Sequence, residues 1–197
     1  METQHRDYLI SIALNAGFVI LEVAVALVFR SLGLLSDAGH KLIDVFALLL
    51  ALVGFRLARR RDGRDYGRIS AGIALVNALI LLGAVAVIIV ESLEKFSAPE
   101  PVNGAAISWS AGVGILVSGL SAWLLMRHRE DINTRAAFLH MATDSLLSLG
   151  VVISGIVISL TGLHIIDPIV SLVIAAVILF NTVRLLRDAL RTLFQKQ

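Results

Sequence analysis

The chain has 197 residues, 57% of them hydrophobic and 16% charged, and this apolar share exceeds the roughly 45–50% that is usual for soluble domains. The composition therefore indicates an integral membrane protein. The formal net charge of +2 comes with no nucleic-acid motif, and the absence of cysteine excludes disulfides, thiolate metal ligands and cysteine nucleophiles.

Six apolar runs are each long enough for a transmembrane helix, which needs about 20 apolar residues. They predict an all-α bundle of six transmembrane helices that form a single domain over residues 1–197. The spans are expected near residues 8–29, 34–56, 69–91, 105–126, 133–160 and 166–186.

The first and third spans carry polar residues at depth. Asn15 and Glu22 are seven residues apart, which places them on one face of the first helix, toward a bundle interior or a water-filled cavity. Asn15 is expected to hydrogen-bond to a neighbouring helix, whereas Glu22 is a candidate proton carrier. Asn77 is the strongly polar residue of the third span. We therefore treat all three as candidate accessory residues.

The fourth span carries a stripe of small residues at every fourth position. Such a stripe lets another helix approach closely. We interpret it as a packing surface rather than a chemical site; it consists of Ser110, Gly114, Ser118 and Ala122.

The second span contains ionisable side chains in a segment that should carry none. Because a helix turns about 100° per residue, His40 and Asp44 lie within about 40° of each other on adjoining turns. The same pair recurs in the fifth span as His140 and Asp144. Two nitrogens and two carboxylates supply the number of ligands that a tetrahedral zinc site requires. These four residues are our candidate metal ligands.

The basic residues predict the orientation of the bundle. Fourteen of the 17 Lys and Arg residues lie on one side of the spans, and the positive-inside rule makes that side cytoplasmic, both termini included. The second and fifth spans then run antiparallel, and Asp44 and Asp144 both lie close to the midplane. The arginine-rich connection over residues 56–68 is able to contact anionic lipid headgroups, although topology alone explains it.

The donor atoms of these four ligands favour a metal of intermediate hardness. Imidazole and carboxylate together suit zinc, with cobalt and cadmium as rivals, while calcium and magnesium require more oxygens. The competing interpretation, hydrogen bonding between helices alone, is weakened by the repetition of the pair at mid-depth, where charged residues are costly. A metalloprotease is disfavoured because no His-Glu-x-x-His helix occurs.

These residues resemble the cation diffusion facilitators, and the resemblance covers the whole chain. The matching segments are Leu35 to His40 with Asp44, Asn77 to Leu79, Arg135 to His140 with Asp144, and Asp167-Pro168. The resemblance implies a multi-pass protein of the inner, cytoplasmic membrane that exports divalent metal, chiefly zinc, in exchange for protons, usually as a homodimer. It also implies that His40, Asp44, His140 and Asp144 form the transport site.

The sequence departs from that family pattern in ways that limit the resemblance. Members generally continue into a cytoplasmic metal-binding domain, whereas this chain ends at Gln197, so we expect a form without that domain. The histidine-rich loop before the fifth span is reduced to residues 127–131, and the glutamate expected at the entry of the third span is missing. Regulation through that domain and metal delivery by the loop are therefore not expected.

We expect a zinc/proton antiporter and not an enzyme, with no permanently bound cofactor. Zinc, cadmium or cobalt is the substrate, protons are the counter-substrate, and nucleic acid is not a partner. A cadmium- or cobalt-preferring exporter, a passive metal channel and a non-transporting scaffold are the alternatives. Because metal binding requires neutral imidazoles and ionised carboxylates, binding should displace protons.

Lys41 is the residue least expected beside a cation site. It follows Asp37 by four residues and precedes Asp44 by three, so a helix brings it near both carboxylates. The favoured hypothesis pairs Lys41 with Asp37 near the outer mouth, which leaves Asp44 for the metal. The rival hypothesis has Lys41 compete for Asp44 and help to expel the metal.

Overall fold

The computed structural model describes residues 2–29, 32–58, 63–97, 104–163 and 165–194. These ranges contain six helices, each of which includes one of the six apolar runs, so the predicted all-helical fold is confirmed. The helices are α1 (Glu2–Phe29), α2 (Leu32–Ala58), α3 (Gly63–Ser97), α4 (Gly104–Met126), α5 (Ile132–Thr161) and α6 (Ile166–Phe194).

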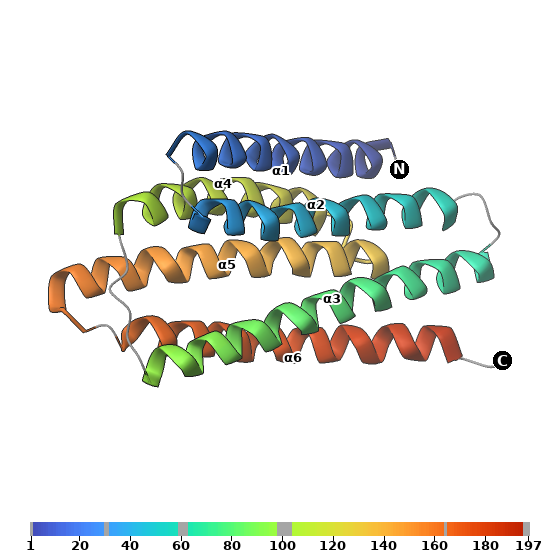
Figure 1. Cartoon of the computed structure of the whole chain (residues 1–197). Helices are drawn as coiled ribbons and strands as arrows, with labels where there is room; N and C mark the ends of the chain where they lie inside the picture. Colours follow the sequence, from blue (N-terminus) through green and yellow to red (C-terminus); the bar gives the residue numbers. More distant parts are fainter. Residues whose placement is uncertain (1, 30–31, 59–62, 98–103, 164, 195–197) are drawn as a thin grey trace.

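Five of the described helices are long and apolar enough to cross a membrane. The exception is α4, whose described apolar segment, Ala111–Met126, is shorter than the other five. The helices lie lengthwise beside one another, and the start of α1 and the end of α6 point toward the same end of the bundle (Figure 1). Six crossings and cytoplasmic termini remain predictions.

Helix α5 lies at the centre of the bundle. It packs against α4 and α2 on one side and against α3 and α6 on the other, while α1 covers α2 and α4. Helix α3 runs obliquely, and it lies away from α2 at the end opposite the α2–α3 connection (Figure 1). This divergence determines which part of α2 is covered by a neighbour.

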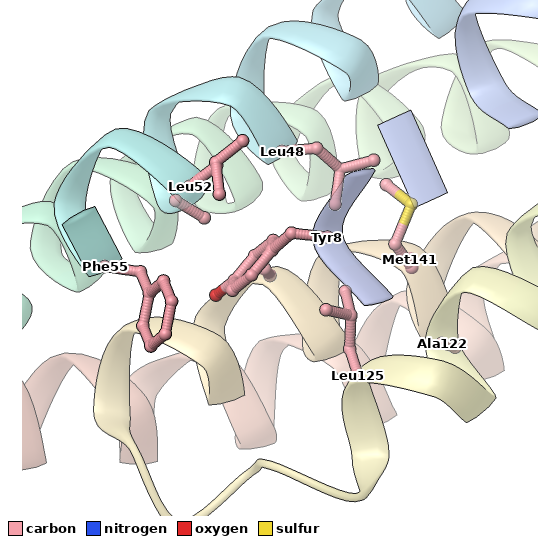
Figure 2. Close-up of a cluster of buried hydrophobic side chains, with 9 residues drawn as sticks. Tyr8, Leu48, Leu52, Phe55, Ala122, Leu125 and Met141 are labelled. Atoms are coloured by element: carbon pink, nitrogen blue, oxygen red, sulfur yellow. The ribbon is translucent and has the colours of Figure 1, made fainter. Parts of the chain in front are cut away.

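The largest apolar cluster joins the first, second, fourth and fifth helices. Figure 2 shows Tyr8 of α1 at its centre, between Leu48 and Phe55 of α2, Leu125 of α4 and Met141 of α5. The ring centroids of Tyr8 and Phe55 are 5.9 Å apart. Two smaller clusters join α3 and α6 to α5, and the first of them is rich in alanine, which allows close helix approach.

A polar network lies beside this cluster, at the start of α5. The Asp131 side chain caps α5 by accepting a hydrogen bond from Thr134 N at 2.9 Å, as helix N-caps commonly do. The Thr134 hydroxyl also donates to Asp131 at 2.8 Å. In turn, Gln4 and Tyr8 of α1 donate to Thr134 Oγ1 at 2.9 and 2.8 Å. The first helix is thereby fastened to the fifth.

Gly54 gives a first test of the packing. A Cβ at Gly54 would lie 2.5 Å from Ile73 Cδ1 and 3.2 Å from the Asn133 amide nitrogen, which itself donates to Ala51 O at 2.7 Å. We expect Gly54→Ala to lower the free energy of unfolding by about 1–3 kcal/mol, because it overpacks the contact of α2 with α3 and α5.

The matched control is Gly17→Ala, since a Cβ at Gly17 meets nothing within 4 Å. This change should be neutral or stabilising by up to about 1 kcal/mol, because alanine favours a helix over glycine. Denaturant unfolding of both variants in detergent measures the difference. Equal stability of the two variants would contradict the close approach at Gly54.

Candidate metal centre

Helices α2 and α5 bring three of the four predicted ligands into the bundle interior. Asp44 on α2 and His140 on α5 are buried, and Asp144 lies one turn further along α5 and is largely covered. The two helices pack directly against each other. The polar side chains thus converge between two apolar helices, where unpaired charge is costly.

Asp44 and His140 form a cross-helix pair. His140 Nε2 and Asp44 Oδ1 are 2.7 Å apart, with side-chain exposures of 5% and 12%. An ionised carboxylate only accepts, so the imidazole donates from Nε2. The other ring nitrogen, His140 Nδ1, is buried and has no hydrogen-bond partner in the described part of the chain. A neutral imidazole in this tautomer presents a lone pair at Nδ1, as a metal ligand requires.

Asp144 forms a second polar group with residues from two other helices. Lys41 Nζ of α2 donates to Asp144 Oδ1, and the Ser118 hydroxyl of α4 donates to Asp144 Oδ2. Both oxygens of this carboxylate are therefore engaged by donors. The Asp44 carboxylate interacts electrostatically with Asp144 and Lys41, so the Asp44–His140 pair and the Asp144 group influence each other.

His40 does not join either group. Its side chain is exposed on α2, one turn from Asp44. At about 100° per residue, His40 lies about 70° away from the direction midway between Lys41 and Asp44, which face α5. Ala47 lies on nearly the same side of α2 as His40 and is buried, and Asn77 of α3 reaches its carbonyl at 3.5 Å. Near the start of α2, α3 has diverged from it (Figure 1).

Among the described residues, no group of three or more His, Asp or Glu side chains is placed to hold a metal ion. The structure instead arranges the candidate ligands as one His–Asp pair and one carboxylate held by Lys41 and Ser118. The four-ligand centre therefore remains a prediction, and His40 and both groups would have to rearrange to form it.

The predicted accessory residues have different surroundings. Asn15 makes the interhelical hydrogen bond that we favoured, from Nδ2 to Ser121 Oγ at 2.9 Å. Glu22 is fully buried on α1, and Asn77 is buried on α3. A proton-carrying role for Glu22 stays a prediction. The Asp37 side chain lies outside the described residues, so the predicted pairing of Lys41 with Asp37 stays a prediction as well.

Sequence reasoning missed two parts of this arrangement. It did not consider Asp144 as the partner of Lys41, and it interpreted the stripe containing Ser118 as packing alone. The stripe is indeed a close contact, because a Cβ at Gly114 would lie 3.1 Å from Ser148 Oγ. Ser118 also hydrogen-bonds a candidate ligand, and the available signal was a hydroxyl on the face that packs against α5.

Comparisons with known proteins cover nearly the whole chain. A family model described as the cation efflux transmembrane domain matches residues 8–194. The chain is 37% identical over 196 residues to the zinc transporter ZitB of Escherichia coli strain K12. The aligned region covers 96% of this chain and 63% of that protein.

Two further relatives are more distant. The chain is 31% identical over 194 residues to the cadmium, cobalt and zinc/H(+)-K(+) antiporter of Bacillus subtilis strain 168, covering 95% of this chain and 62% of that protein. It is 30% identical over 195 residues to the metal cation efflux system protein CzcD of Cupriavidus metallidurans, covering 96% and 62%. The chain thus spans less than two thirds of the length of these curated relatives.

Proposed function

Because this chain belongs to the cation efflux family, we propose that it exports a divalent metal cation, most favourably zinc, from the cytoplasm in exchange for protons. The family is one of transporters rather than catalytic enzymes. Family membership and the apolar helices make the chain a multi-pass protein of the bacterial inner membrane. The metal is the substrate here and not a resident cofactor.

The observation that carries the proposal is the buried pair of Asp44 and His140 beside Asp144. Imidazole nitrogen and carboxylate oxygen are the donors that suit zinc, and the His140 ring has an unsatisfied buried nitrogen. The names of the relatives add cadmium and cobalt as candidate cargo. We assign His40, Asp44, His140 and Asp144 as the ligands of the transport site.

Proton coupling follows from the chemistry of these ligands. A metal ion requires a neutral imidazole and ionised carboxylates, so any proton held by the site must leave when the metal binds. In alternating access, a site that faces one side of the membrane at a time converts this competition into exchange. The proposal includes six crossings with cytoplasmic termini and a homodimer in a lipid bilayer.

The test is metal flux into proteoliposomes with and without an imposed pH gradient. With the lumen more acidic than the bath, we expect zinc uptake to exceed the rate at equal pH, and zinc entry should alkalinise the lumen. A dye trapped in the lumen reports the proton movement. Zinc uptake that ignores the gradient would favour a passive channel, and the absence of uptake and binding would favour a non-transporting scaffold.

Metal preference needs separate measurements. The same vesicles are assayed with zinc, cadmium and cobalt at equal free concentration, with protein-free vesicles as the control for leakage. We expect zinc to be transported fastest, because the assigned donor set combines two imidazoles with two carboxylates in a tetrahedral number. A faster flux of cadmium or cobalt would reassign the cargo while leaving the exchange mechanism in place.

A further inference from the structure

Lys41 is a buried cation in direct contact with an assigned metal ligand. Its Nζ forms an ion pair with Asp144 Oδ1, and the two side chains are 6% and 18% exposed. Charges that lie away from water are screened weakly, so this attraction is stronger than it would be at a surface. Lys41 therefore adds a positive charge to the transport site, in addition to any contribution to the stability of α2.

Helix α4 lies beside the pair of Lys41 and Asp144. A Cβ at Gly114 of α4 would lie 3.9 Å from Lys41 Nζ, an ordinary contact distance, so the ammonium lies close to α4 at this position. Ser118, one turn further along α4, donates to the other oxygen of Asp144. The lysine and the serine together engage both oxygens of this carboxylate, which are the atoms that a metal would use.

We propose that Lys41 competes with the transported metal for Asp144, as a cation tethered to the protein beside the site. This inference rests on the proposed function. An ammonium and a divalent ion repel each other at contact with one carboxylate, so metal binding at Asp144 requires Lys41 Nζ to move away. The return of Lys41 to Asp144 then favours metal release. Lys41 thus weakens metal binding while it speeds unloading.

The charges of the site give the same expectation. With neutral imidazoles, Asp44, Asp144 and Lys41 sum to −1, and a bound divalent ion raises this sum to +1. Without Lys41 the corresponding sums are −2 and 0, and a neutral loaded site is less costly in a membrane interior than a charged one. Removal of the lysine charge should therefore favour the loaded state.

The experiment compares zinc binding by the full chain and its variants, in nanodiscs and at one fixed pH, by isothermal titration calorimetry. Lys41→Gln removes the charge but keeps a donor for Asp144. We expect it to bind zinc at least about tenfold more tightly than the unmodified chain, which is about 1.4 kcal/mol. Stopped-flow release with a chelator should show slower unloading by a similar factor.

Two further variants make the result specific. Lys41→Arg keeps the charge and can bind both oxygens of a carboxylate, so it should bind zinc no more tightly than the unmodified chain. Arg135→Gln removes a cation that is paired with Asp188 at 2.8 Å, outside the site, and should leave zinc affinity within threefold of the unmodified value. If Lys41→Gln does not fold, Lys41→Met removes the same charge and carries the same expectation of tighter zinc binding.

The outcomes separate the inference from the proposed function. Unchanged or weaker binding by Lys41→Gln, or tighter binding by Lys41→Arg, would overturn the competition while zinc transport stands. An equal gain in Arg135→Gln would show that general positive charge, and not contact with Asp144, is responsible. If neither the unmodified chain nor any variant binds zinc, the proposed function fails and the inference fails with it.

Discussion

Alanine at Asp44 or at Asp144 should reduce zinc flux to the level of protein-free liposomes. Each change removes one of the four assigned ligands, and the remaining shell is incomplete. It also removes one carboxylate of a buried group, which leaves His140 or Lys41 without its described partner. The measurement is zinc uptake under a pH gradient, normalised to the amount of protein inserted.

The matched control is Asp188→Ala, which removes an aspartate from a partly exposed pair with Arg135. Such pairs contribute about 0–1 kcal/mol, so transport should continue at a rate close to that of the unmodified chain. Loss of flux in Asp188→Ala as well would show that aspartate removal impairs assembly in general. Full flux in Asp44→Ala or Asp144→Ala would remove that residue from the site.

His40→Ala belongs to the same series and tests the part of the site that the structure leaves apart. If His40 swings inward to complete the four-ligand shell, its removal should abolish transport as the aspartate changes do. If transport continues at a substantial rate, the metal is held by Asp44, His140 and Asp144 without it. His140→Ala should abolish transport under either arrangement.

The second large effect is expected at the centre of the main apolar cluster. Tyr8→Ala should lower the free energy of unfolding by about 3–5 kcal/mol, the range found when a large buried aromatic side chain is truncated. Tyr8 is fully buried among four helices, and its hydroxyl donates to Thr134 at 2.8 Å. The change therefore leaves both a cavity and a broken connection between α1 and α5.

Tyr8→Phe separates these two contributions. It keeps the ring and removes the hydroxyl, so it should cost only about 0.5–1.5 kcal/mol, the usual value of one hydrogen bond. Denaturant unfolding in detergent, followed by tryptophan fluorescence, measures both variants. If Tyr8→Ala costs no more than Tyr8→Phe, the ring is not packed as Figure 2 shows it.

The positions of the helices could be predicted from the sequence because each of them contains a long apolar run. A run such as residues 133–160 has to form a helix in a membrane, where every backbone polar group needs an internal partner. The structure begins α5 at Ile132, one residue from the predicted start. The sequence also singled out Asp44 and His140 as ionisable residues in apolar runs, and the structure buries both, while their role as metal ligands stays a prediction.

The partner of Lys41 was not predictable in the same way. Spacing within one helix favours Asp37, four residues earlier, whereas the described partner Asp144 lies on another helix. That contact depends on how far α2 slides along α5, which no local pattern encodes. The exposure of His40 likewise depends on how the neighbouring helices pack around α2, and the contact of Ser118 depends on which face of α4 meets α5.

The connection of α1 to Thr134 has a consequence for how the protein is made. Thr134 follows Gln4 by 130 residues and Tyr8 by 126 residues. Ribosomes add about 5–20 residues per second, so α1 waits roughly 6–25 s before its polar side chains meet their partners. During that interval Gln4 and Tyr8, both buried in the finished bundle, lack the partner to which they donate there. We therefore expect α1 to complete its docking onto the bundle only after the start of α5 has been synthesised.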